Sequence, residues 1–308
     1  MISDKKAATT AAAFPPHIKH PDSVRSMTAD VLIALLPAAV WGVYAFGVRA
    51  LIIMLISLVT AVLTEVVFDL IAKRSVTVGD LSAVVTGVIL SFFMPVTVPL
   101  YIPAAGALFA IVIVKCAFGG LGCNFLNPAL GGFVFVKLCF PASFVIENDP
   151  LLTLKEGGIP NIPLYDMIVG NNPGSIGEVS ALLLLAGGVY LIIRGTADWR
   201  IPVSFIGVVA VIALMLAQNV NNLSFMEYEL LSGALFLSAI FAATDPVTTP
   251  VKRSGRLIFG LGCGGLTMIL RYFGAEPDGT AYAVLTMNLL SGIIDRLTSH
   301  ERQVTPDE

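Results

Sequence analysis

Charged residues are scarce in this chain: Asp, Glu, Lys and Arg make up 13% of its 308 residues, whereas hydrophobic residues make up 56%. A mean hydropathy of +0.87 lies outside the range of water-soluble domains. The formal net charge is only −3 and the basic residues are scattered, so the composition gives no support to nucleic acid as a partner. We therefore expect a polytopic membrane protein whose surroundings include membrane lipid.

Cysteine is also rare, and the four cysteines form no Cys-X-X-Cys pair. Each lies in or beside an apolar segment, a pattern that favours structural thiols over a metal site. We predict no metal centre. The first apolar run begins at Val31 and lacks a small-residue cleavage site, which argues against a removed signal peptide.

One motif is present twice in the chain. Residues 81–99 and 231–250 each run an apolar stretch into a Pro-Val-Thr-X-Pro break, at Pro95–Pro99 and at Pro246–Pro250. Hydrophobic segments interrupted by proline at corresponding places in two halves indicate a site near the membrane midplane of an inverted-repeat protein. The sequence therefore predicts a site where the two breaks meet.

The apolar segments predict an all-α fold, because a helix crosses a bilayer with about 17 to 25 mostly apolar residues. The expected spans are 30–47, 50–72, 80–95, 100–117, 128–146, 178–194, 201–218, 230–243, 256–273 and 280–296. The segments 80–95 and 230–243 are short and end at the breaks, so we read them as half-helices followed by irregular backbone. The expected fold is about ten transmembrane helices in two inverted five-helix repeats with broken half-helices.

The distribution of Lys and Arg orients these spans, because basic residues near helix ends stay on the cytoplasmic side. With the N-terminus inside, that side collects most basic residues, Lys115 among them. The organisation expected is a cytoplasmic segment (1–28), a first repeat (29–146), an outer loop (147–177), a second repeat (178–297) and a cytoplasmic tail (298–308). An outer loop of that length is either functional or disordered.

The segment Gly119–Pro128 (GGLGCNFLNP) is a candidate binding site. Its glycines let backbone N–H groups approach a ligand, and Asn124 and Asn127 add side-chain amides beside Gly122. A tight re-entrant turn with helix-capping asparagines explains the same residues. Both interpretations stay open at the level of sequence.

Acidic residues near the membrane need a partner or a pathway. Asp245 and Thr248 lie at the second break, where they suit a ligand site, although a salt bridge to the following Lys252, Arg253 or Arg256 is an equal alternative. Glu65 and Asp80 lie near the inner ends of the second and third spans. These two carboxylates are candidates for an ion pathway.

The expected outer face has two further features. Ser175–Glu178 place a hydroxyl and a carboxylate before the sixth span, which is typical of a helix-capping box. Arg271 is positioned to bind a phosphate or to pair with Glu276.

Several strings in the chain resemble one known family. They are Pro16-His17, ALLP (34–37), DLSAVVTG (80–87), GGLGCNFLNPA (119–129), GNNPGSIGEVSAL (170–182), FAATDPVTTP (241–250) and Ile294-Asp295. In this order and spacing they are similar to the family that contains the D subunit of the Rnf ion-translocating electron transport complex and the B subunit of the sodium-translocating NADH:quinone oxidoreductase. The forms GNNPGSIGE and TDPVTTP resemble the Rnf protein more.

The resemblance implies a subunit of a complex that moves electrons between ferredoxin and NAD and couples this to transport of Na⁺ or H⁺. Its partners would be flavoprotein, iron–sulfur and small membrane subunits in a bacterial or archaeal cytoplasmic (inner) membrane. The family carries FMN, usually esterified to a threonine of the outer loop, and can hold riboflavin non-covalently. The protein then positions the flavin and tunes it.

The outer loop departs from this family pattern. Asp149 stands where the flavin-bearing threonine is expected, and a carboxylate cannot form that phosphoester. Thr153 lacks the flanking Ala and Pro of the acceptor and is a weak alternative. We therefore expect FMN or riboflavin held non-covalently, with Gly122, Asn124, Asn127, Asp245 and Thr248 as candidate ligands. The alternative function is a small-solute or ion channel of urea-channel-like architecture without redox activity.

Overall fold

The computed structural model describes residues 23–178, 180–217 and 221–298, and within these ranges the regular structure is helical. The expectation of an all-α fold is thereby confirmed. An isolated β-bridge joins Pro95 of the first break to Ser175. Most of the expected N-terminal segment 1–28 and nearly all of the tail 298–308 lie outside the described residues.

Helices of the first half follow one another with short connections. They are α1 (Val24–Phe46), α2 (Val48–Ile71), η1 (Val78–Asp80), α3 (Ser82–Phe92), α4 (Tyr101–Phe109), η2 (Ala110–Cys116) and α5 (Pro128–Cys139). The segment η2 is a π-helix that continues α4, and π-helical turns are frequent at functional sites.

The second half is joined to the first by a loop that contains three short helices. These are η3 (Pro141–Phe144), α6 (Pro150–Lys155) and α7 (Leu164–Val169). The remaining helices are α8 (Ala181–Arg194), α9 (Arg200–Leu216), α10 (Asn222–Leu231), α11 (Leu235–Leu237), η4 (Ser238–Ala242), α12 (Arg253–Phe273) and α13 (Thr280–Thr298). The segment η4 is a second π-helix, and it leads directly into the second break.

Two expected helix boundaries were wrong. The fifth segment does not stay helical to residue 146, because α5 ends at Cys139 and Pro141 cannot donate an N–H to continue it. The segment 230–243 is not one half-helix either. It is the second arm of a bent pair, Asn222–Leu231 and Leu235–Ala242, whose axes differ by 62° across Ser232 and Gly233.

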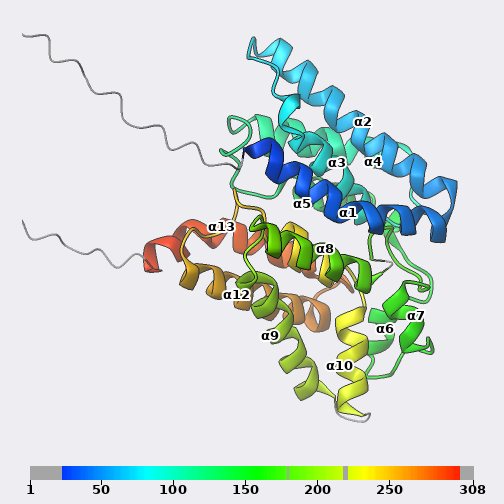
Figure 1. Cartoon of the computed structure of the whole chain (residues 1–308). Helices are drawn as coiled ribbons and strands as arrows, with labels where there is room; N and C mark the ends of the chain where they lie inside the picture. The colour runs from blue at the N-terminus through cyan, green and yellow to red at the C-terminus, as the bar shows by residue number, and fades with distance from the viewer. Residues whose placement is uncertain (1–22, 179, 218–220, 299–308) are drawn as a thin grey trace, which may run out of the picture.

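The two halves pack against each other through α1 and α8, which lie side by side in the centre of Figure 1. On one side of this centre α2 covers α3 and α4, and on the other α9 and α13 pack against α12. The beginning of α1 and the end of α13 lie on the left of the view, and α6 and α7 lie on the right (Figure 1). The loop helices are thus remote from both ends of the described chain.

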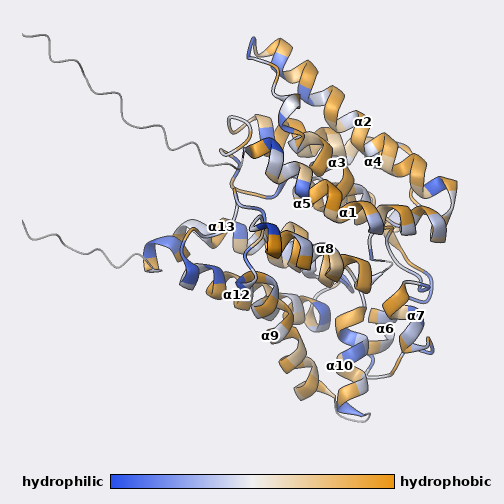
Figure 2. Cartoon of the chain, viewed as in Figure 1, coloured by the Kyte–Doolittle hydropathy of each residue, from blue (hydrophilic) through white to orange (hydrophobic). Residues whose placement is uncertain are grey.

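Helix α2 shows how the chain separates a packed face from an apolar outer face. Residues of one stripe, including Ile53, Ala61 and Glu65, are buried against the neighbouring helices. On the opposite stripe, Leu55 and Leu63 are about half exposed, and the helix is hydrophobic along most of its length in Figure 2. An exposed apolar helix face of this size suits lipid or another membrane subunit.

The described residues contain three helices long and apolar enough to cross a membrane, namely α1, α2 and α12, or four if the bent pair is one span. Shorter apolar helices make up most of the rest, including α3, α5, α8 and α9. The chain is therefore an all-helical membrane protein with several apolar helices.

Candidate functional site

A cavity of about 290 Å³ lies beside the N-terminal end of α1 and brings both halves of the chain together. We call it the amide cavity. Its walls come from the first turns of α1 and α3, the end of α8, the GGLGCNFLNP segment and the second break. The volume is at the lower end of the range usual for small-molecule sites. Of the predicted ligands, Gly122, Asn124, Asn127 and Asp245 line it.

Asn127 fixes the geometry at the base of this cavity. Its Oδ1 accepts hydrogen bonds from the N–H groups of Ala129 (3.0 Å) and Leu130 (3.3 Å), which caps α5, and Pro128 occupies the first helical position. Its Nδ2 donates to the carbonyl oxygen of Ala242 at 3.1 Å. The capping interpretation is thus correct, and the same side chain also ties the first half to η4 beside the second break.

Asn124 has an unused acceptor. Its Nδ2 donates to the carbonyl oxygen of Leu126 at 3.1 Å, but its Oδ1 is buried without a hydrogen-bond partner among the described residues. The residue is 4% exposed. A buried amide oxygen without a donor costs about 1–3 kcal/mol. Because Asn124 lines the amide cavity, a ligand that donates a hydrogen bond there would remove this cost.

Asp245 and Thr248 were predicted to act together, and they are neighbours in one turn, where the N–H of Thr248 donates to the carbonyl oxygen of Asp245 at 3.3 Å. Asp245 lines the amide cavity, and its Oδ1 accepts from the N–H of Val247 at 3.2 Å. Thr248 is 2% exposed and lies outside the cavity lining, where its carbonyl accepts from Asn288 Nδ2. Of the two residues, Asp245 lines the cavity and Thr248 lies in the same turn outside the lining.

The basic residues after the second break have other partners. Arg256 pairs with Asp198 at 2.6 Å and donates to the carbonyl of Pro250. Lys252 donates to the carbonyl of Thr298. Lys252 and Arg256 therefore do not form the salt bridge to Asp245 that the sequence analysis gave as an alternative.

Next to the amide cavity, Glu65 of α2 is paired with Lys115 of η2 at 2.6 Å. Both side chains are buried, at 1% and 2% exposure, and Lys115 also lines the cavity. The sequence analysis counted Lys115 on the cytoplasmic side, and the structure buries its side chain within the protein. Asp80 does not join the pair directly, and its Oδ1 accepts from the N–H and hydroxyl of Ser82 at 2.8 and 2.5 Å.

A second cavity lies at the opposite end of α3, and we call it the carboxylate cavity. Its lining is acidic, with Asp149, Glu178, Glu276 and Asp278. Lys137 lines it as well and pairs with Glu276 at 2.8 Å, with Phe133 under its ammonium group. The 147–177 loop therefore contributes to a cavity and is ordered around it.

Asp149 caps α6 within this cavity, its Oδ1 accepting from the N–H of Leu151 at 2.9 Å. Burial raises the pKa of its carboxyl group, and the nearby Asp278 adds to the increase. Thr153 lies a turn further along α6 and is outside the cavity lining. The structure thus gives Asp149 a helix-capping role, which a carboxylate fulfils well.

Glu178 does not cap the sixth span as predicted. Helix α8 begins at Ala181, and Ser180 caps it by accepting from the N–H of Leu183. Glu178 lies before the helix and accepts from the N–H of Ser175 at 2.8 Å. Burial, and then the neighbouring Asp278, raise its pKa from the usual 4.5 to about 7.

This pKa shift predicts a pH-dependent stability. The folded chain holds the proton of Glu178 more tightly than the unfolded chain does, so stability rises as the pH falls from about 7 toward 4.5. We expect Glu178→Gln, which is neutral at every pH, to raise the Tm at pH 8 and to flatten the Tm profile between about pH 7 and pH 4.5. Thermal melts of the purified chain in detergent measure this. Glu156→Gln, at an exposed position of the same loop, is the control, and an identical profile for Glu178→Gln and wild type contradicts the prediction.

Arg271 of α12 is paired with residues that the sequence did not suggest. It donates to the carbonyl (2.8 Å) and carboxylate (3.0 Å) oxygens of Glu229 and to the carbonyl of Ser232 (2.9 Å). Its guanidinium also lies 3.7 Å from Asp278. Glu276 is committed to Lys137, so the sequence pairing was wrong.

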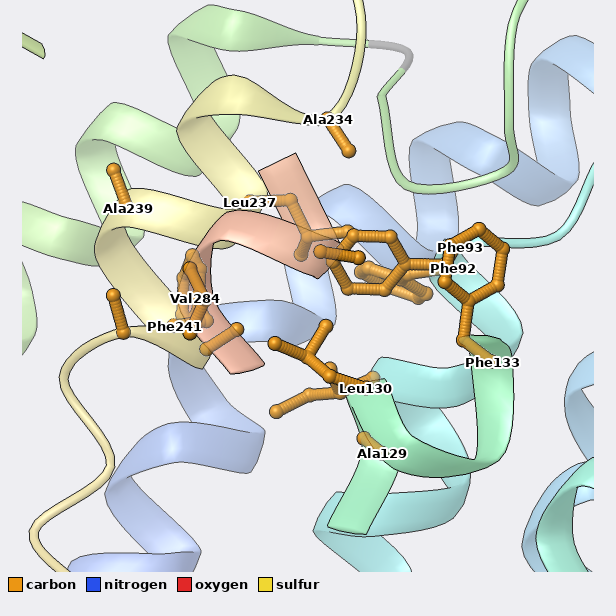
Figure 3. Packing of buried hydrophobic residues seen from close by; sticks show 14 of the residues in the cluster. Phe92, Phe93, Ala129, Leu130, Phe133, Ala234, Leu237, Ala239, Phe241 and Val284 are labelled. Atoms are coloured by element: carbon orange, nitrogen blue, oxygen red, sulfur yellow. The ribbon is translucent and has the colours of Figure 1, made fainter. Parts of the chain in front are cut away.

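An apolar layer separates the two cavities (Figure 3). On α5, Ala129 lines the amide cavity and Phe133 lines the carboxylate cavity, with Leu130 fully buried between them. On α3, Phe92 is buried in the same layer. Side chains of η4 and α13 complete it, among them Phe241 and Val284. Water and ions are excluded from such a layer because they lose their hydration there.

Comparisons with known proteins identify the family of this chain. Residues 11–303 match the model of the NQR2, RnfD, RnfE family. The chain is 40% identical over 297 residues to the D subunit of the Na⁺-translocating ferredoxin:NAD⁺ oxidoreductase complex of Acetobacterium woodii, with 92% of each chain covered. It is 35% identical over 306 residues to the D subunit of the proton-translocating ferredoxin:NAD⁺ oxidoreductase complex of Clostridium ljungdahlii, again with 92% of each covered.

A third relative is archaeal: the D subunit of the ion-translocating oxidoreductase complex of Methanosarcina acetivorans is 33% identical over 285 residues. It covers 92% of this chain and 93% of its own length. The fold and cavities define a helical membrane protein with a cavity between its halves. The chain belongs to the NQR2, RnfD, RnfE family, which confirms the resemblance carried by its motifs.

Sequence reasoning missed several residues of these sites. Lys115 was used only to orient the spans, although its position inside the apolar run IVIVKCAF was a signal of burial. Thr77 and Ser82 carry no signal in the sequence, and they contact the Glu65 and Lys115 side chains through the fold. Asp278 lies in the GAEPDG turn and joins the carboxylate cavity because α12 and α13 bring that turn there.

Proposed function

We propose that this chain is a membrane subunit of an ion-translocating ferredoxin:NAD oxidoreductase complex and that its amide cavity holds a flavin non-covalently. The first part is supported by family membership and by relatives that are named as subunits of such complexes. The partners are then the flavoprotein, iron–sulfur and small membrane subunits of the complex. The relatives include both sodium- and proton-translocating complexes, so Na⁺ or H⁺ is the transported ion.

The proposed membrane arrangement is two inverted repeats of five crossings each, 29–146 and 178–297, joined by an outer loop at 147–177. The order of elements supports it: in each half a longer helix precedes a short helical segment that leads to the proline break, and another helix follows the break. The described chain begins and ends on one side, as an even number of crossings requires (Figure 1). Both termini are placed in the cytoplasm of a bacterial or archaeal cell by the distribution of basic residues.

The flavin proposal rests on the unused acceptor of Asn124. Asn124, Gly122 and Asp245 line the cavity, whose walls are mostly apolar. A flavin presents a flat apolar ring system with a polar edge that both donates and accepts hydrogen bonds. The ring supplies the electron-transfer chemistry when bound.

The residues of the cavity would bind and shield such a ring. Val85 and Ile89 of α3 and Phe241 of η4 provide apolar surface. Asn127 holds the wall in place through its hydrogen bonds to α5 and η4. Lys115 places a positive charge at the edge of the cavity, and a nearby cation favours electron uptake by a bound group.

The cavity proposal predicts which variant loses flavin. We expect Asn124→Leu to retain at least tenfold less flavin than wild type, because it removes the acceptor and its larger branched end fills part of the cavity. The measurement is the visible spectrum of flavin extracted from the purified chain. Asn171→Leu, at an exposed position in the 147–177 loop, should retain the wild-type amount. Absence of FMN and riboflavin from the wild-type chain under native conditions would contradict the flavin proposal.

A companion measurement addresses covalent attachment. With Asp149 at the position expected for the acceptor threonine, the denatured chain should show no flavin fluorescence in a gel. A fluorescent band that maps to Thr153 or another residue of this chain contradicts the non-covalent assignment.

The alternative function is a channel for a small solute or ion without redox activity, and flux measurements in vesicles test it. The buried layer of Phe92, Leu130 and Phe241 between the two cavities disfavours an open pore. Solute flux through vesicles that contain this chain alone, without partner subunits or an electron donor, would favour the channel.

A further inference from the structure

Helix α1 contains a buried carboxylate, Asp30, which is 7% exposed. Its Oδ1 accepts a hydrogen bond from Tyr190 Oη at 2.9 Å, and Arg194 Nε lies 3.2 Å from both carboxylate oxygens. Thr196 Oγ1 donates to Oδ2 at 3.3 Å. All three partners belong to the end of α8 and the turn after it. A single side chain of α1 therefore binds this segment at three points.

Asp30 lies on the face of α1 that packs against α8. Ala34, one helical turn further along, lies on the same face. The carbonyl oxygen of Ala34 lies 2.5 Å from the position that a Cβ atom would take at Gly187 of α8. This close backbone approach provides only van der Waals attraction, whereas the bonds of Asp30 involve a charged acceptor. The Asp30 network therefore adds a strong polar attachment to the contact between the two helices.

The same two segments form walls of the amide cavity. Helix α1 contributes one face with helical spacing, namely Val24, Met27, Thr28 and Val31. The end of α8 and the following turn contribute Leu191, Thr196 and Ala197. Thr196 belongs to both arrangements, since it lines the cavity and donates to Asp30. Asp30 itself is outside the lining, and it holds the two walls together from behind.

The attachment of the α1 wall to η1 is weaker. Thr28 Oγ1 lies 2.6 Å from the carbonyl oxygen of Asp80. The same hydroxyl lies 3.0 and 3.1 Å from the carbonyl oxygens of Val24 and Arg25 in its own helix. It has one hydrogen for these three acceptors. Hydrogen bonds to a charged group are about twice as strong as neutral ones, so the position of the α1 wall depends more on Asp30 than on Thr28.

We propose that Asp30 is a positioning residue of the amide cavity. It holds the first turns of α1 against the end of α8, and this keeps the two walls at the spacing that retains a bound flavin. Without the carboxylate, the hydroxyls of Tyr190 and Thr196 lose their acceptor and the α1 wall moves more freely. The inference rests on the flavin proposal for the identity of the ligand. It goes beyond that proposal by assigning retention of the ligand to a residue that does not touch it.

The test is the rate at which flavin leaves the purified full chain after dilution in detergent. Released flavin is separated by filtration and measured by its fluorescence. We expect Asp30→Ala to release flavin about tenfold faster than wild type, because the hydrogen bonds between the two walls are lost. Asp30→Asn keeps the shape and one acceptor oxygen, so it should release flavin only about threefold faster.

Glu229 provides a matched control. It is also a buried carboxylate bonded to an arginine and a tyrosine, Arg271 and Tyr272, but it lies outside the lining of the amide cavity. Glu229→Gln should lower the Tm and leave the rate of flavin release close to that of wild type. A merely structural role for Asp30 predicts the same pattern for Asp30→Ala. A lower Tm with an unchanged release rate from the folded Asp30→Ala chain therefore overturns the inference.

A second measurement does not depend on flavin. Val31→Cys places a thiol in the α1 wall, in a chain whose exposed cysteines are removed by Cys123→Ser and Cys139→Ser. We expect Asp30→Ala to raise the rate of labelling by a water-soluble maleimide about fivefold, because the wall opens more often, and Glu229→Gln to leave it unchanged. Equal labelling with and without the Asp30 carboxylate overturns the inference. Faster labelling of Asp30→Ala in a chain that contains no flavin supports the positioning role and contradicts the flavin proposal alone.

Discussion

Arg271→Met is expected to destabilise the chain by about 3–5 kcal/mol, because it removes one partner of a buried ion pair and leaves the other charge uncompensated. Arg271 and Glu229 are 2% and 1% exposed. The same guanidinium also binds the carbonyl of Ser232, at the bend between α10 and α11. Loss of Arg271 therefore removes hydrogen bonds from α10 and from the bend that follows it. The expected result is a large fall in Tm and little accumulation of the chain in membranes.

A double variant distinguishes the cost of the unpaired charge from the cost of lost packing around Arg271. In Arg271→Met with Glu229→Gln, the buried carboxylate is neutralised together with its partner, so part of the lost stability should return. Arg25→Met removes an exposed arginine near the start of α1. It should change the free energy of unfolding by less than about 0.5 kcal/mol and leave the Tm close to that of wild type. Thermal melts monitored by size-exclusion chromatography measure all three. Equal Tm values for Arg271→Met and wild type would falsify the assignment of this pair.

Gly187→Leu is expected to separate α1 from α8 and to remove flavin from the amide cavity. A Cβ atom at Gly187 would lie 2.5 Å from the carbonyl oxygen of Ala34 and 3.1 Å from Cζ of Phe241. The first contact is with backbone, so helix α1 itself must move. Overpacking of a tight contact usually costs about 1–3 kcal/mol, and the leucine side chain is larger than the single methyl group that already clashes here. The displacement of Phe241 would disturb a wall of the cavity.

Gly207→Ala provides the matched control. Gly207 lies within α9, and a Cβ atom there meets no atom of the described residues within 4 Å. Alanine in a helix is favoured over glycine by about 1 kcal/mol, so this variant should be as stable as wild type or slightly more stable. Tm and extracted flavin are measured for both variants. If Gly187→Leu retains the wild-type Tm and flavin, the close contact of α1 with α8 does not hold the two halves together.

The sequence predicted most helices because their signals are local. Apolar run length placed α1, α2 and α12, and proline ended α3 and η4 near the two breaks. Asn127 was recognised as a helix cap because Asn followed by Pro is a strong local signal for a helix start. The bend between α10 and α11 was missed, since the polar residues of α10 hid a helix that is held by tertiary contacts.

The pairing of charged residues could not be predicted from sequence. Lys115 had no predicted partner, and Arg271 was expected to bind a phosphate or Glu276, yet their partners are Glu65 and Glu229. These partners lie 50 and 42 positions away in the chain. Electrostatic attraction depends on distance in space and on the local dielectric, and neither is encoded in the neighbouring residues.

The amino-acid sequence by itself determined that this protein lies in a membrane, that its helices break twice at proline, and that it belongs to one family. These properties follow from composition, proline chemistry and local motifs. The tertiary structure decided that Asn124 and Asp245 line one cavity, that Thr248 lies outside its lining, and that Glu65 has an oxygen without a partner among the described residues. The physical reason is that burial and hydrogen-bond satisfaction arise only when helices distant in the chain are packed together.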